Sequence, residues 1–327
     1  MPLLAHWEDL GFHAVPRRVV SLVPSVTESI FEIGCGDRLL GITDYCVHPA
    51  DSVRRVPKVG GTKNPDLQRL KAIMPDLIIA NQEENGQAAL EALAAEGFRI
   101  WLTFPRTVRH ALDLLHDLVQ LFRVPQMDQG LSALETAYEW ASLAAESARP
   151  VRVFCPIWLE PNWWMTFNRD TYIHDLLRIC GAENVFADRD RHYPLSADLA
   201  APEHSLPSTI ASPPAGDADP ERDAVYGQTH GSAPLRDTRY PRVTLAEIAA
   251  HAPELILLPS EPYDFTAADL DAFDEYRDIP AVKHNNIKFV DGSLLTWHGI
   301  RLAQALSELP ALINAMAMDE EQSGDHP

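Results

Sequence analysis

The stretch LQRLKAIMPDLIIANQE (residues 67–83) has the same pattern of residue types as LAEIAAHAPELILLPSE (residues 245–261), at a constant offset of 178 residues (245 − 67). In each stretch a helical pattern ends at a proline, an acidic residue follows, and an apolar run of strand length comes next. The second copy matches the first helix for helix and strand for strand. A unit that occurs twice predicts two lobes of similar build.

Seven strands are predicted, separated by helical patterns, at residues 19–23, 39–43, 77–80, 99–102, 151–155, 255–258 and 287–290. This alternation predicts parallel sheets covered by helices. Residues 126–149 contain no proline and carry apolar residues at helical spacing, so they are predicted to form one long helix. The fold class is therefore α/β, with an N-terminal lobe (1–125) and a C-terminal lobe (150–327), each built on a small parallel sheet flanked by helices, joined by the helix 126–149.

Composition excludes several classes of protein. The chain has 27 Lys and Arg against 47 Asp and Glu, a net charge of −20, which disfavours nucleic acid and anionic membranes as partners. Its four cysteines are widely spaced, which indicates neither a zinc ribbon nor a disulfide framework. Glu8 and Asp9 stand where a signal peptide needs an uninterrupted apolar core, and no apolar run approaches the length of a transmembrane helix. As written, the chain is expected to be cytoplasmic without membrane insertion, or periplasmic if its true start lies upstream.

The segment 188–240 is rich in proline, alanine and polar residues. Such a composition buries too little apolar area to offset the entropy of ordering, so mostly irregular structure is expected. It could form a surface loop, or a lid over a cleft.

The first predicted strand runs into a helix through VVSLVPSVTESIFEIG (residues 19–34). Ser25 or Thr27 could cap the helix, while Glu28 would lie near the positive end of its dipole. Alternatively, these side chains face a ligand, because α/β proteins bind ligands at the carboxyl ends of their strands.

A tryptophan-rich stretch, IWLEPNWWMTFNRDTY (residues 157–172), fits neither a helical stripe nor strand alternation. Its three tryptophans could pack as core beneath a loop. They could also grip a large flat ligand through buried area and ring stacking.

The chain resembles two-lobed substrate-binding proteins with a helical backbone, the cobalamin, iron-siderophore and haem receptors of ABC importers. The resemblance is carried by RRVVSLVPSVTESIFEIGCGDRLLGITDYCVHP, VPKVGGTKNPDLQRLKAIMPDLIIA, TYIHDLLRICGAENVF and VTLAEIAAHAPELILLPSEPYDF, and is closest for the cobalamin branch. It implies a monomeric binding protein that holds a corrinoid or related metal chelate in the cleft between its lobes, as an importer receptor or a soluble carrier. It also implies an ABC permease as partner, and no catalytic cofactor.

The ligand-binding residues expected from this resemblance and from the strand ends are Pro24, Ser25, Thr27, Glu28, Tyr45, Gly61, Thr62, Asn81, Trp158, Trp163, Trp164, Glu261, Tyr263 and Trp297. His298 could be an axial metal ligand, or a hydrogen-bonded surface histidine. The sequence departs from the pattern of the cobalamin receptors in two respects. The first is that these receptors commonly present aromatic residues at positions that correspond approximately to Thr62 and Asn81 of this chain.

Cobalamin receptors also dock on their permease through one exposed glutamate per lobe, at positions that fall near Gln87 and Thr296, neither of which is acidic. Glu83 and Glu261, equivalent through the repeat, could substitute as docking residues. Alternatively, the chain no longer meets a permease.

Two other functions are weighed. A chelatase-like enzyme of tetrapyrrole or metal metabolism would suit a two-lobed α/β chain, but the G-x-S-x-G, G-x-x-x-x-G-K-[ST], H-E-x-x-H and G-x-G-x-x-G motifs are all missing from the sequence. A receptor for a free transition metal would need three or four converging His and carboxylate ligands, whereas the 13 histidines are scattered. A binding protein rather than an enzyme is therefore expected.

Overall fold

The computed structural model describes residues 5–192 and 237–323, and the side chains of these residues up to 314. Most of the segment 188–240 thus lies outside the described residues, as does the expectation of its irregular structure. The chain divides into two compact units. The first comprises the residues up to Glu135 together with Trp297–Leu302, and the second comprises Thr136–Thr296 and the chain from Ala303 onward.

The first unit is built on a four-stranded parallel sheet with the strand order β2-β1-β3-β4. The strands are β1 (Val19–Ser21), β2 (Leu39–Ile42), β3 (Leu77–Asn81) and β4 (Ile100–Thr103). Every residue of β1 and β3 is buried, so both faces of these central strands are covered. Near-continuous apolar runs are what such doubly covered parallel strands require.

The helices of the first unit are α1 (Pro24–Glu32), α2 (Ala50–Val53), α3 (Leu67–Ile73), α4 (Gln87–Ala95) and α5 (Val108–Phe122), with 3-10 turns η1 (Trp7–Leu10), η2 (Gly36–Arg38) and η3 (Pro125–Met127). Leu70 of α3 and Leu93 of α4 pack with Val20 and Ile78 in one core cluster, so these two helices cover the same face of the sheet. The loops that follow β1, β2 and β3 leave the sheet at its carboxyl edge, where the candidate site lies.

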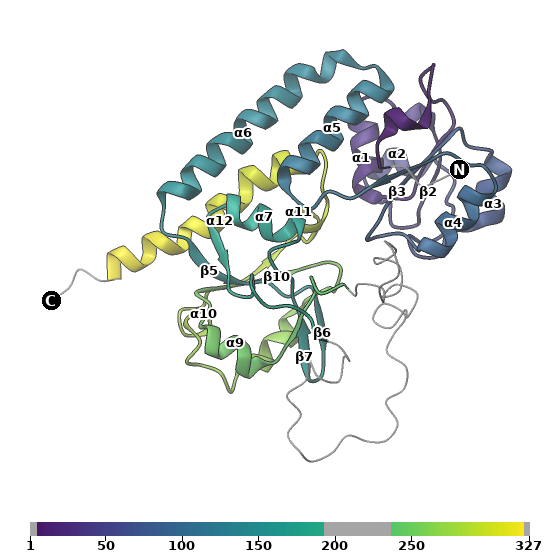
Figure 1. The fold of residues 1–327 in the computed structure, drawn as a ribbon. Coiled ribbons are helices and arrows are strands. Elements are labelled where there is room, and N and C mark those ends of the chain that lie inside the picture. The colour runs from purple at the N-terminus through teal and green to yellow at the C-terminus, as the bar shows by residue number, and fades with distance from the viewer. Residues whose placement is uncertain (1–4, 193–236, 324–327) are drawn as a thin grey trace, which may run out of the picture. The chain divides into compact units, whose positions relative to one another are not determined.

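Helix α6 (Asp128–Ser147) is the long helix, and it runs unbroken from the first unit into the second (Figure 1). It starts two residues later and ends two residues earlier than predicted, because the residues Pro125–Met127 before it form the separate turn η3. The described residues contain no helix with the length and apolarity that crossing a bilayer requires.

The second unit holds a parallel sheet with the order β11-β10-β5-β8. Its strands are β5 (Val151–Phe154), β8 (Ala182–Asn184), β10 (Leu255–Pro259) and β11 (Ile287–Val290). Beside it lies a three-stranded antiparallel sheet, β6-β7-β9, formed by β6 (Trp158–Glu160), β7 (Trp163–Met165) and β9 (Arg242–Val243). The sequence did not predict this antiparallel sheet.

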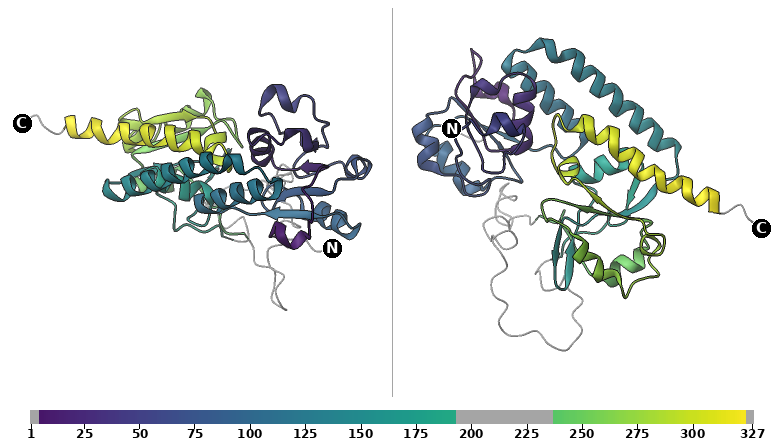
Figure 2. Two further views of the ribbon diagram at one scale, coloured as in Figure 1. Left: turned by 90° about the horizontal axis from the view of Figure 1, so that it is seen from above. Right: turned by 180° about the vertical axis from the view of Figure 1, so that it is seen from behind.

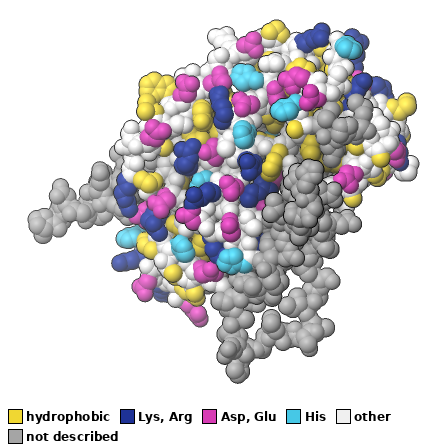
Figure 3. All heavy atoms as spheres, viewed as in Figure 1, with side chains coloured by type: hydrophobic (Ala, Val, Ile, Leu, Met, Phe, Trp, Pro, Cys, Tyr) yellow, Lys and Arg dark blue, Asp and Glu magenta, His cyan; other side chains and the backbone are white. Residues whose placement is uncertain are grey.

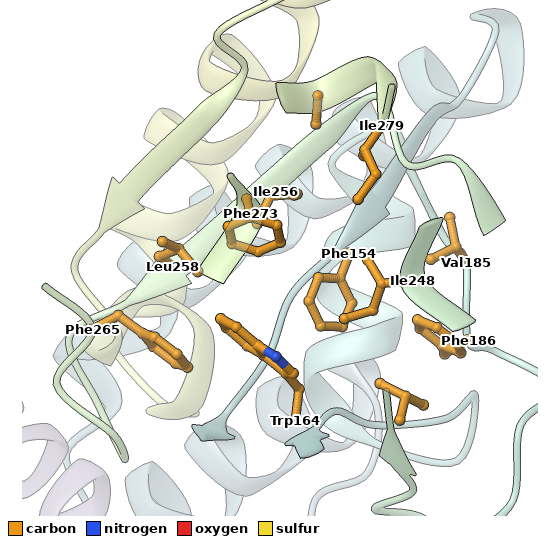
Figure 4. Packing of buried hydrophobic residues seen from close by; sticks show 12 residues of the cluster. Phe154, Trp164, Val185, Phe186, Ile248, Ile256, Leu258, Phe265, Phe273 and Ile279 are labelled. Atoms are coloured by element: carbon orange, nitrogen blue, oxygen red, sulfur yellow. The ribbon is translucent and has the colours of Figure 1, made fainter. Parts of the chain in front are cut away.

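The helices of the second unit are α7 (Tyr172–Ile179), α9 (Leu245–His251), α10 (Pro280–Lys283), α11 (Ser293–Thr296) and α12 (Leu302–Ser323), with the 3-10 helix η5 (Ala267–Phe273). Helices α7, α11 and α12 lie on one side of the parallel sheet, and α9 and α10 lie on the other (Figures 1 and 2). Ile248 of α9 and Ala281 of α10 pack against Ile256 and Leu258 of β10 in the core shown in part in Figure 4.

The internal repeat is present in the structure residue for residue. Helix α3 and strand β3 in the first unit correspond to α9 and β10 in the second, at the same offset of 178 residues. Asp66 and Thr244 cap the two helices through side-chain hydrogen bonds. Met74 and Ala252, one residue before each proline, take the left-handed conformation with φ of 48° and 44°. The seven predicted strands are all present, with ends that differ by at most one or two residues.

Candidate functional site

The carboxyl ends of β1 and β3 in the first unit meet a segment from late in the chain, Trp297–Leu302. His298 of this segment is buried, with 5% of its surface exposed. Its Nδ1 lies 3.3 Å from Ser25 Oγ at the start of α1, and its Nε2 lies 3.3 Å from Asn81 Nδ2 at the end of β3. Burial lowers the pKa of His298 to about 4, so the ring is neutral at physiological pH.

Asn81 and Asn85 hold the turn that follows β3. Asn81 Oδ1 accepts hydrogen bonds from the backbone N–H groups of Glu83 (2.7 Å) and Glu84 (3.2 Å). Asn85 Nδ2 donates to the carbonyl oxygens of Leu22 and Thr62, both at 3.0 Å. Asn81 is 1% exposed, and its amide holds the turn through these hydrogen bonds.

Ser25 and Thr27 do not cap α1, which corrects one of the two interpretations of these residues. The N-cap residue is Val23, which makes no side-chain cap hydrogen bond, and Pro24 opens the helix. Thr27 is fully buried. Its Oγ1 lies 2.8 Å from Ser21 Oγ and 3.0 Å from Val23 O, and both oxygens can accept a hydrogen bond from its hydroxyl. A buried hydroxyl needs such partners, so these bonds fix the turn from β1 into α1.

Glu28 forms an ion pair with Arg301, whose Nε and Nη2 lie 2.7 Å and 3.0 Å from its two carboxylate oxygens. Both side chains are nearly buried, at 12% and 11% exposed. The Arg301 guanidinium also lies over the Trp297 ring, 5.0 Å from its centroid, and His48 contacts that ring edge-on. Glu28 and Trp297 therefore have protein partners where a ligand contact was expected.

Tyr45 is the expected site residue that the first unit exposes most. It follows β2 and is 60% exposed. A Cβ added to Gly61 would lie 3.7 Å from the Tyr45 ring, so this ring lies over the Gly61–Thr62 loop. Val47, two residues along, is 51% exposed. These two residues form a small apolar surface on the loop after β2.

The tryptophan-rich stretch of the second unit is a β-hairpin. Strands β6 and β7 pair in the register Glu160↔Trp163, and the turn is Pro161–Asn162. Trp158 is half-buried: its ring meets Tyr263 edge-on with centroids 5.7 Å apart, and its Nε1 donates to Glu160 Oε1. Trp158 and Tyr263 thus form a partly exposed aromatic pair.

Trp164 belongs to the hydrophobic core, the alternative that the sequence left open. It is 2% exposed and stacks on Phe265, with centroids 5.7 Å apart and ring planes at 2°, while Phe154 and Phe273 also contact it (Figure 4). Trp163 is 8% exposed and lies 4.0 Å beneath the guanidinium of Arg242. Both rings are therefore occupied by protein contacts.

Glu83 and Glu261, the pair proposed for docking, are both half-buried. Glu261 Oε1 accepts a hydrogen bond of 2.7 Å from Thr296 Oγ1, within the second unit. A Cβ on Gly292 would come within 2.6 Å of Glu261, so this glycine is required for the close approach of the two loops. The position near Thr296, expected to be acidic in cobalamin receptors, thus hydrogen-bonds the glutamate that the repeat supplies.

The described residues contain no group of three or more His, Cys, Asp or Glu side chains arranged to hold a metal ion. Both His298 nitrogens lie within hydrogen-bond distance of protein groups, which favours the hydrogen-bonded alternative, although the ring is buried and not on the surface. All four cysteines are buried and unpaired by disulfides. Burial raises the pKa of Cys180 to about 12, and it raises the pKa of Cys46 as well, so neither is a ready metal-binding thiolate.

Charge is mixed on the surface. Figure 3 shows acidic, basic and hydrophobic side chains interspersed over the described part of the face in view. Arg301, which the sequence did not suggest, is the main addition to the expected set of site residues. No local pattern in the sequence marks Arg301, because its partner Glu28 lies 273 residues earlier in the chain and the pairing is seen only in the folded structure.

Comparison with known proteins shows the family to which this chain belongs. A family model described as "Periplasmic binding protein" matches residues 19–202. The vitamin B12-binding protein of Pectobacterium atrosepticum is 30% identical over 190 residues. That alignment covers 56% of this chain and 66% of the relative, slightly under two thirds of its length.

Solved structures share the fold. The periplasmic vitamin B12-binding protein BtuF of Vibrio cholerae superposes with a TM-score of 0.68 at 17% identity, covering 92% of this chain and 98% of BtuF. The periplasmic haem-binding protein RhuT from Roseiflexus sp. RS-1 gives a TM-score of 0.65 at 17% identity, covering 92% and 99%. Two α/β units, each built on a parallel sheet and linked by one long helix, are the fold that this chain shares with these solved periplasmic binding proteins. The chain belongs to the periplasmic binding protein family.

Proposed function

We propose that this protein binds a cobalamin-like corrinoid, or a related metal chelate such as haem, as the receptor of an ABC importer or as a soluble carrier. The observation that carries the proposal is the 30% identity to a vitamin B12-binding protein over 190 residues. The names of the vitamin B12-binding relative and of the haem-binding structural neighbour support a flat metal chelate as the ligand class.

The exposed aromatic side chains on strand-end loops are the proposed ligand contacts. Tyr45 in the first unit and the Trp158–Tyr263 pair in the second unit keep ring surface exposed, unlike Trp164 and Trp297. Burying apolar area against a macrocycle is worth about 25 cal/mol per Å², and ring stacking adds about 0.5–1.5 kcal/mol. Each of these exposed rings could therefore contribute affinity for a planar ligand that its own unit contacts.

Docking to a permease is the second part of the proposal. Glu83 and Glu261 lie at equivalent positions of the repeat, each in the loop that follows its strand, β3 or β10. A pair of glutamates in corresponding loops suits recognition by arginines of a symmetric partner. The family name supports an extracytoplasmic site of action for such a receptor.

The test is direct, because bound corrinoids and haem report themselves by colour. Purified full-length protein is mixed with cyanocobalamin and, separately, with haemin, and the absorbance spectrum and heat of binding are recorded. Binding of either ligand with one-to-one stoichiometry supports the proposal. No spectral change and no heat with both ligands would refute it.

Variants then assign the contacts. Replacing Tyr45 or Trp158 by alanine should weaken binding by roughly 5- to 30-fold, equivalent to about 1–2 kcal/mol of lost contact. Trp140→Ala is the matched control, because Trp140 is 68% exposed on α6 and is outside the proposed contacts. Equal loss of affinity in the control and in Trp158→Ala would show that the effect is not specific to the site.

A further inference from the structure

The hydrogen bonds around Asn81 determine the protonation state of each nitrogen of His298. Asn81 Oδ1 is engaged as an acceptor by two backbone N–H groups, those of Glu83 and Glu84. The group that Asn81 turns toward His298 is consequently its Nδ2, a donor. A donor requires an acceptor opposite, so His298 Nε2 carries no hydrogen.

The proton of the neutral ring must then be on Nδ1. That nitrogen lies 3.3 Å from Ser25 Oγ, which can accept the hydrogen bond. The result is a directed chain in which His298 Nδ1–H donates to Ser25 and Asn81 Nδ2–H donates to His298 Nε2. A neutral histidine with a single tautomer follows from the contacts alone.

We infer that His298, as the Nδ1–H tautomer, is a positioning residue that locks the Asn81 amide and thereby fixes the turn carrying Glu83 and Glu84. The two functions are joined in one side-chain amide. Asn81 Oδ1 accepts hydrogen bonds from the N–H groups of Glu83 and Glu84, while Asn81 Nδ2 of the same amide contacts His298 Nε2. What the turn does for the ligand or permease rests on the proposed function, whereas the tautomer and the lock do not.

The three residues that follow His298 hold this segment against α1. Gly299 has φ of +110°, and a Cβ there would lie 2.5 Å from Ser29 Oγ, so only glycine permits this approach to α1. Ile300 N donates to Ser29 Oγ, and Arg301 pairs with Glu28 of the same helix. The ring of His298 therefore has a defined place from which to hold Asn81.

Protonation would reverse the pattern. A hydrogen on Nε2 would face the Asn81 amide N–H groups, and the nearest carboxylate, Glu84 Oε1, lies 3.8 Å away. The other charged or titratable groups around the segment are Glu28 of α1, which pairs with Arg301 of the segment itself, and His48, which contacts Trp297. An imidazolium would gain Glu84 as partner and lose Asn81, which releases the clamp on the turn.

Two variants separate the roles of the two nitrogens. His298→Gln can place an amide oxygen toward Asn81 Nδ2, in the role of Nε2. His298→Asn is shorter, can serve only Ser25, and leaves Asn81 without its acceptor. Both remove the ring, so His298→Gln is the matched control for lost packing.

The first measurement is NMR on the full-length protein without ligand. Long-range ¹H–¹⁵N correlations of His298 should show the Nδ1–H tautomer at pH 7, and hydrogen exchange should find the Glu83 and Glu84 amides protected. In His298→Asn these two amides should exchange at least about tenfold faster, while in His298→Gln they should change by less than about threefold. In the parent, the turn resonances should shift with the same pH midpoint as the His298 ring.

An Nε2–H tautomer or a charged ring at pH 7 would overturn the inference, as would unchanged Glu83 and Glu84 exchange in His298→Asn. The second measurement is the affinity for cyanocobalamin or haemin, whichever the parent binds, which should fall roughly 2- to 10-fold in His298→Asn and less in His298→Gln. If the parent binds neither ligand, the proposed function fails while the lock is still decided by NMR.

Discussion

Replacing Trp164 by alanine should destabilise the second unit and leave ligand contacts intact. The side chain is 2% exposed, stacks on Phe265, and contacts Phe154 and Phe273. Truncating a buried aromatic residue in a close-packed core costs about 3–5 kcal/mol, since both the transfer energy and the packing contacts are lost. With a total stability of about 5–15 kcal/mol, this is a large share, and a lowering of the melting temperature by roughly 10 °C is expected.

The assay pairs urea unfolding, followed by far-UV circular dichroism, with ligand affinity measured well below the unfolding transition. Trp158→Ala is the comparison, because Trp158 is half-buried in the same hairpin and contacts Tyr263 at its edge. The two variants should divide their effects in opposite ways, with stability lost in Trp164→Ala and affinity lost in Trp158→Ala. If Trp164→Ala unfolded like the parent while losing affinity, the assignment of Trp164 to the core would be refuted.

Two further outcomes are expected. Burial lowers the pKa of His298 to about 4 from its ordinary value of 6.5, so the unfolded chain binds more protons between these pH values and stability falls as pH drops from about 6.5 to about 4. This group accounts for at most roughly 3 kcal/mol of that loss, and unfolding curves of His298→Gln should show a correspondingly shallower pH dependence; equal slopes in both proteins would contradict the assignment. Asp66→Ala and Thr244→Ala each remove a side-chain cap from equivalent helices and should each cost about 1 kcal/mol in urea unfolding, with no measurable loss in either arguing against the caps.

Local signals explain why the two repeated units could be predicted. In α3–β3 and α9–β10, the cap at one end, the left-handed stop and proline at the other, and the apolar strand are all encoded within 17 consecutive residues. None of these features depends on distant parts of the chain. Seven of the eight strands of the parallel sheets were predicted because they consist mostly of apolar residues, whereas β8 (Ala182–Asn184) is too short and too polar to show such a run.

The hairpin β6–β7 was not predicted because its residues lack the local sequence signals that mark the repeated units. Trp163, Trp164 and Met165 are all buried, so β7 shows no alternation of apolar and polar residues. Its turn, Pro161–Asn162, contains no glycine, the residue that most strongly indicates a two-residue hairpin. The burial of β7 on both sides depends on Arg242 over one tryptophan and Phe265 against the other, and both lie far along the chain.

The candidate site shows where prediction from sequence stops. The ends of β1, β2 and β3 identify the loops that can meet a ligand, because parallel strands place their carboxyl ends on one edge. Which side chains on those loops already have protein partners depends on Trp297–Leu302, whose His298 and Arg301 each lie 273 residues after the residue they contact, Ser25 or Glu28. This segment engages Ser25 with a histidine and Glu28 with an arginine, so both expected contact residues already have protein partners, while Tyr45 keeps its exposed ring. A change in ligand preference is therefore expected to come from Tyr45, whereas changes at Ser25, Glu28 or His298 alter the geometry of the loops.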